Sequence, residues 1–62
     1  MERNSIVGND DPTEIANYLV QEHGLLKAID VAVDGVAKAK AARDNYSLSI
    51  WRQVRGLLRS RQ

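Results

Sequence analysis

The chain has 62 residues, 44% of them hydrophobic, with no cysteine and a formal net charge of +1. This length allows one domain, and the lack of cysteine excludes a disulfide framework and a thiolate metal site. The hydrophobic content is too high for an intrinsically disordered chain. A core of this size rarely supplies more than about 3–5 kcal/mol, and small domains often gain stability by forming oligomers.

No apolar run in the sequence approaches the roughly 18 residues of a membrane-spanning helix. Residues 1–12 also lack the apolar segment of a secretory signal. We therefore expect a cytoplasmic protein with no membrane partner.

The charges are divided unevenly along the chain. Residues 1–34 contain seven acidic and two basic side chains, a balance of −5, whereas residues 35–62 contain one acidic and seven basic side chains, a balance of +6. Such a split indicates either electrostatic matching within the chain or between subunits, or a basic end that meets a polyanion. The sequence leaves both readings open.

The first helix has a clear start signal. Asp11 can accept hydrogen bonds from free backbone amides, and Pro12 suits the first helical position. Glu14 stands where a capping box places its carboxylate. The pattern predicts a helix over 12–23, closed by Gly24 as a left-handed cap.

The longest helix-patterned run covers 25–43. At 100° per residue its apolar side chains form two neighbouring stripes. The bulky stripe consists of Leu26, Ile29, Val33 and Val36, and the small stripe of Ala28, Ala32, Gly35, Ala39 and Ala42. Together they cover roughly 200°, whereas a surface helix needs about half of that. We expect a central helix that contacts both neighbours and whose core side is the bulky stripe.

The small stripe predicts a close packing seam, because alanine and glycine let a second helix backbone approach. Gly35 costs about 1 kcal/mol relative to alanine in a helix interior, and close approach would offset this; a merely tolerated glycine or a kink is the alternative. Two short neighbouring helices do not obviously cover so wide an apolar arc. We therefore expect two copies of the chain to meet at an interface formed by Ala28, Ala32, Gly35 and Ala39, or at Trp51.

A third helix is expected over 46–60, with Asp44, Asn45 or Ser47 as its cap. Its apolar side contains Tyr46, Ile50, Trp51, Val54, Leu57 and Leu58. Trp51 is the largest apolar side chain and is expected to dominate the core. The alternative is that Trp51 anchors a partner interface.

The other side of the third helix carries Arg52, Arg55 and Arg59. Their spacing of three and four would let them meet successive phosphates of a nucleic acid. Further basic residues that would extend this surface are Lys38, Lys40, Arg43 and Arg61. The competing interpretation is a solvated helix face, which the small net charge favours. The junction at Gly24 also lacks the usual turn of a helix-turn-helix.

Motifs that carry chemistry are missing from the sequence. There is no Walker loop, dinucleotide fingerprint or metal-spaced His/Cys cluster. His23 is the single histidine and has no placed nucleophile beside it, so a packing or capping role is expected. We expect no enzymatic activity, no cofactor, no metal and no small-molecule substrate.

A loose pattern of residues resembles a group of short helical proteins of alphaproteobacteria. It consists of Tyr18 and His23-Gly24, the Ala-rich run, the Arg43-Asp44 turn and Trp51-Arg52-Gln53-Val54. The similarity covers about residues 12–58. It implies a bacterial cytoplasmic origin and a compact helical fold, and it implies no activity.

The sequence therefore predicts an all-α fold. It consists of a flexible leader over 1–10 and a single three-helix domain over 11–62 with a central Ala-rich helix. The expected function is that of a small non-enzymatic interaction or regulatory module that self-associates as a homodimer. The alternative is a small nucleic-acid-binding regulator that uses the basic face of the third helix.

Overall fold

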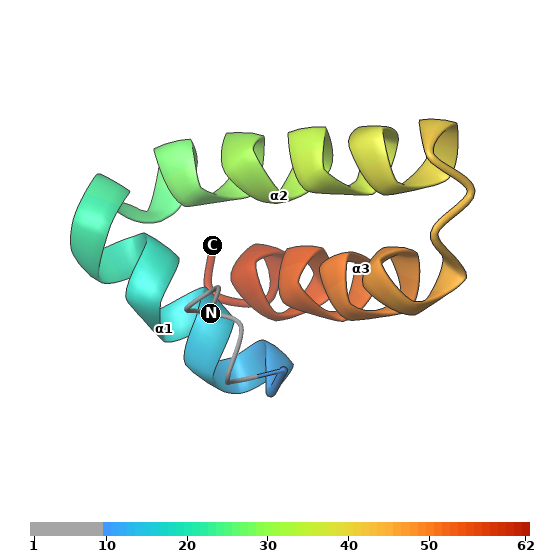
Figure 1. The fold of residues 1–62 in the computed structure, drawn as a ribbon. Coiled ribbons are helices and arrows are strands. Elements are labelled where there is room, and N and C mark those ends of the chain that lie inside the picture. The colour runs from blue at the N-terminus through green and yellow to red at the C-terminus, as the bar shows by residue number, and fades with distance from the viewer. Residues whose placement is uncertain (1–9) are drawn as a thin grey trace.

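The computed structural model describes residues 10–62, and these form three helices. They are α1 (Pro12–His23), α2 (Leu25–Ala41) and α3 (Asn45–Arg59). Helices α2 and α3 lie side by side in opposite directions, and α1 crosses the end at which α2 begins and α3 finishes (Figure 1). No strand occurs in this part of the chain, so the all-α prediction is confirmed. Apart from Asp10, the predicted leader over 1–10 lies outside the described residues.

The start of α1 follows the predicted capping pattern. Oδ1 of Asp11 accepts a hydrogen bond from the backbone N–H of Thr13 at 3.0 Å, and Pro12 occupies the first helical turn. The cap satisfies one of the free amides at the helix start. Local sequence alone is therefore sufficient to place this end of the helix.

Gly24 forms the corner between α1 and α2 without any further loop. Its N–H donates to the carbonyl of Val20 at 2.8 Å, and its own carbonyl accepts from the N–H of Ala28 at 2.9 Å. The backbone angles at Gly24 are φ 85° and ψ 160°. The predicted positive φ is confirmed, but the extended ψ places the residue outside the left-handed helical region. This combination of angles is essentially restricted to glycine.

Gly24 and Gly56 form a matched pair for a test of backbone strain. A Cβ added at either position meets no atom within 4 Å, but only Gly24 has a positive φ. We expect Gly24→Ala to lower the free energy of unfolding by about 1–2 kcal/mol through strain. Gly56→Ala should raise it by about 1 kcal/mol, because alanine favours a helix interior. Urea unfolding of both variants measures the two effects. Changes of the same sign in the free energy of unfolding would contradict this explanation.

Helix α2 ends at Ala41, two residues before the predicted end at 43, because the backbone reverses at Arg43. Arg43 has φ 57°, and its N–H donates to the carbonyl of Lys40 at 3.1 Å. The N–H of Asp44 donates to the carbonyl of Ala39 at 2.9 Å. This pair of bonds is a Schellman motif, in which glycine usually takes the left-handed position. Because an arginine at this position does not indicate a helix end by its residue type, the sequence alone did not place the end correctly.

Asp44 then caps α3. Its Oδ1 accepts the backbone N–H of Ser47 at 3.1 Å, and its Oδ2 accepts the Ser47 hydroxyl at 2.8 Å. These bonds to the ionised carboxylate lower the pKa of Asp44 below its ordinary value. Of the three predicted cap residues, Asp44 is the one that performs this role.

Helix α2 faces the core with a different side from the one predicted. The buried residues within 10–62 are Ala16, Leu19, Ala28, Ala32, Val36, Ala39, Val54 and Leu58. Three alanines of the small stripe, Ala28, Ala32 and Ala39, thus face inward, whereas Leu26 is 72% exposed and Val33 is 43% exposed. The prediction that the bulky stripe forms the core side of α2 is wrong for these two residues. The large side chains of α3 supply the volume, so α2 presents small ones to them.

Gly35 permits the close contact between α2 and α3. A Cβ at this position would lie 2.6 Å from Cε2 and 2.8 Å from Cε3 of the Trp51 ring. The close-approach reading of Gly35 is therefore correct, although the neighbour is an indole ring rather than a helix backbone. Trp51 itself is half-buried at the edge of the core, and the fully buried large side chains are Leu58 and Val54. The expectation that Trp51 dominates the core is wrong.

Candidate interaction surfaces

The small-residue seam lies inside the chain. Ala28 and Ala32 are 0% exposed and Ala39 is 6% exposed, while Gly35 lies under the ring of Trp51. The close packing predicted for these residues is made by α3 of the same chain. A second copy cannot reach the fully buried Ala28 and Ala32 while the fold is intact, so this placement of the dimer interface is corrected.

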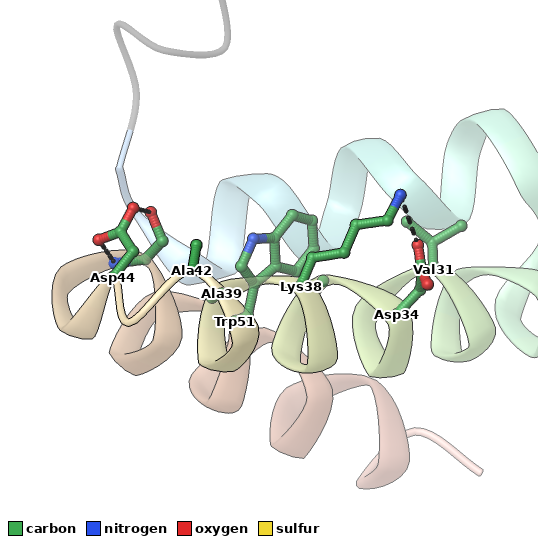
Figure 2. A pocket seen from close by; sticks show the side chains of 9 residues that line it. Val31, Asp34, Lys38, Ala39, Ala42, Asp44 and Trp51 are labelled. Atoms are coloured by element: carbon green, nitrogen blue, oxygen red, sulfur yellow. Dashed lines mark hydrogen bonds and ion pairs between the residues drawn. The ribbon is translucent and has the colours of Figure 1, made fainter.

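Trp51 is the member of the predicted interaction set that a partner can reach. It borders an open groove of about 430 Å³ between α2 and the first half of α3. Figure 2 shows the indole ring between the Asp34–Lys38 pair at one end and Asp44 at the other. The apolar part of the lining comes from Val31, Ala39, Ala42 and the ring itself.

The charged groups of this groove are already engaged within the chain. Nζ of Lys38 lies 3.0 Å from Oδ2 of Asp34, in the i,i+4 arrangement predicted by their spacing. Asp44 is occupied by its two bonds to Ser47. The groove is therefore a shallow surface with an aromatic floor and no unpaired charge directed into it.

A second surface consists of the exposed bulky edge of α2, defined by Leu26 and Val33. The two residues are seven positions apart and so lie on the same side of the helix. The half-buried Ile29 and the exposed Ala37 lie on the same edge. Sequence reasoning recognised the stripe but assigned it to the core. The signal that could have corrected this is the size of the apolar residues on α3, which leaves room only for small ones opposite.

The arginine stripe forms a third surface. Arg52 and Arg59 are exposed and Arg55 is half-buried, on a flank of α3 next to the side that carries the buried Val54 and Leu58. Within residues 10–62 no carboxylate forms an ion pair with these three side chains. The structure therefore brings the predicted arginines together without neutralising them.

The basic residues expected to extend the stripe lie elsewhere. Lys38 is paired with Asp34, and Arg43 lies in the turn at the opposite end of α3 from Arg59. The guanidinium of Arg61 donates to Oδ1 of Asn17 at 2.6 Å, which joins the end of the chain to α1. Lys40 belongs to α2, so the basic residues that share one side of α3 are Arg52, Arg55 and Arg59.

A polar contact also joins the beginning of the described chain to α3. The Tyr46 hydroxyl donates a hydrogen bond to the carboxylate of Asp10. This bond, together with the negative charge of Asp10, raises the pKa of the tyrosine above its ordinary value. Asp10 is held beside the first turn of α3 by this contact.

His23 is exposed in the last turn of α1. Across residues 10–62 no group of three metal-ligating side chains converges. In the same part of the chain, no helix combines the length and apolar character needed to cross a bilayer.

Comparisons with protein-family models, curated proteins and solved structures find no match to this chain. The surfaces themselves must therefore carry the functional argument.

Proposed function

We propose that this protein is a small non-enzymatic interaction module of the bacterial cytoplasm that self-associates through the exposed bulky edge of α2. The observation that supports this proposal is the 72% exposure of Leu26 together with the 43% exposure of Val33 on the same edge. Burying a side chain of this kind completely contributes about 1.5–3 kcal/mol. For a 62-residue domain that is a large fraction of the total stability.

A second copy of the chain is the simplest occupant of this edge. In a two-fold dimer the same patch is used by both subunits, so Leu26 and Val33 would each be buried twice. The neighbouring Asp34–Lys38 pair is balanced in charge and would not repel its counterpart. Self-association would therefore cover four bulky side chains per dimer without isolating a charge.

Sedimentation velocity over a protein dilution series tests the proposal. We expect the parent protein to sediment as a dimer that dissociates on dilution, and Leu26→Lys to remain a monomer throughout. Because Leu26 is mostly exposed, the variant should keep its helical circular dichroism. Ser49→Lys adds the same charge on an exposed position of α3 and should leave the dimer intact. A parent protein that is monomeric at every concentration, or a dimer unaffected by Leu26→Lys, would refute the proposal.

A further inference from the structure

The last part of the chain has an unusual set of charges. Residues 45–62 contain four arginines, no lysine and no acidic residue, whereas all three lysines of the protein belong to α2. Three of the arginines, Arg52, Arg55 and Arg59, form the stripe on the outer side of α3. A general solubilising face commonly mixes both signs of charge. An arginine-only face instead has the chemistry of planar, bidentate recognition.

The positive charges of this stripe are not paired within the described part of the chain. Within residues 10–62 the three guanidinium groups make no ion pair, whereas Lys38 is paired with Asp34. Uncompensated charges of one sign along a helix add to a local positive potential that attracts anions. Ion pairs within residues 10–62 therefore do not neutralise the positive charge of this face.

The surface beside the arginine stripe is low. Ser49, Gly56 and Ser60 are exposed on the same outer side, and a Cβ at Gly56 would meet no atom within 4 Å. Packing within the chain therefore does not require glycine here, although glycine weakens a helix interior. A low face lets the backbone of α3 approach an extended surface while the arginines reach out along one side of it.

The start of α1 borders one side of this face. Asp11 and Thr13 lie with Gln53, Gly56 and Ser60 around a groove of about 570 Å³ between the start of α1 and the second half of α3. This border limits the contact to a narrow strip along one helix.

We propose that the outer face of α3 binds the phosphate backbone of a nucleic acid duplex through Arg52, Arg55 and Arg59. A guanidinium group forms two parallel hydrogen bonds with a phosphate and keeps its charge at all physiological pH values. An α-helix about 10–12 Å across fits the major groove of B-DNA, which is about 12 Å wide. Because the contacts are to phosphates, binding is independent of sequence and weakens as salt increases.

Fluorescence anisotropy with a labelled DNA duplex of about 20 base pairs tests this proposal between about 50 and 200 mM salt. For three phosphate contacts we expect a slope of about −3 in a plot of log K against log salt. Arg52→Ala and Arg59→Ala should each reduce the slope by about one. Lys27→Ala removes a charge from the outer side of α2 and should leave the slope unchanged.

Gly56→Glu provides a second test that keeps every arginine. Glutamate favours a helix more than glycine does, so the variant should fold, but its carboxylate would lie among the arginines and abolish binding. Binding that persists in this variant, or in the arginine variants, overturns the proposal, as does absence of binding by the parent protein at 50 mM salt. A labelled polyglutamate peptide that binds where the duplex does not would identify an acidic protein as the partner instead. Leu26→Lys is measured in parallel, so that loss of self-association and loss of duplex binding are distinguished.

Discussion

Replacing Leu58 by alanine is expected to unfold most of the protein at room temperature. Leu58 is 0% exposed, in the cluster that joins the three helices. Removing such a side chain costs about 2–5 kcal/mol, from the lost transfer free energy and the cavity that remains. A core of this size rarely supplies more than about 3–5 kcal/mol in total. Far-UV circular dichroism should therefore show a large loss of helix for Leu58→Ala.

The neighbouring residue provides the control for this prediction. Leu57 is only half-buried, so Leu57→Ala should remain folded with a smaller reduction in the urea midpoint. Leu58→Met conserves most of the volume and should cost less than about 1.5 kcal/mol. If Leu57→Ala and Leu58→Ala unfold equally, the core does not have the arrangement described.

Replacing Gly35 by leucine is expected to destabilise the protein by about 3 kcal/mol or more, because the new side chain would occupy the space of an indole ring. The nearest atoms to a Cβ at this position belong to Trp51, and the ring centre cannot yield as the tip of a flexible side chain does. This loss of stability is expected in the monomer, since the contact lies within one chain. Thermal unfolding followed by circular dichroism measures it at a concentration at which the protein is monomeric.

A double-mutant cycle isolates the contact between the two residues. In a Trp51→Ala background the space beside Gly35 is empty, so Gly35→Leu should cost much less there than in the parent protein. Ala37→Leu places the same side chain on an exposed position of α2 and should be nearly neutral. Equal costs of Gly35→Leu in both backgrounds would show that the ring is not what opposes leucine.

The helix boundaries were predictable where a local interaction, such as a cap, sets them. Asp11 and Pro12 begin α1, Gly24 closes it, and Asp44 caps α3, each through backbone groups only a few residues away. These interactions require nothing from the rest of the fold, so a pattern of residue types is sufficient to find them. Arg43 is the exception, because an arginine in the left-handed position does not mark a helix end by its residue type.

The candidate surfaces were predictable only in part. The arginine stripe follows from the helical spacing of Arg52, Arg55 and Arg59, and the structure places these residues together as expected. The close packing predicted at Ala28 and Ala32 is made within the chain, since both residues are in the core, whereas Leu26 is exposed. That these arginines form no ion pair within residues 10–62 could be learned only from the arrangement of all three helices.

What the sequence determined by itself is the set of three helices, because capping, helical periodicity and the special backbone of Gly24 are local properties. Which side of α2 faces inward was decided by the tertiary structure. Both stripes of α2 are apolar, so transfer of either from water is favourable, and periodicity cannot choose between them. Packing decides between them, because Val54 and Leu58 of α3 fill the interior and the Trp51 ring covers its edge, so only small residues opposite them avoid overlap. The exposed edge at Leu26 and Val33 is the consequence of that choice.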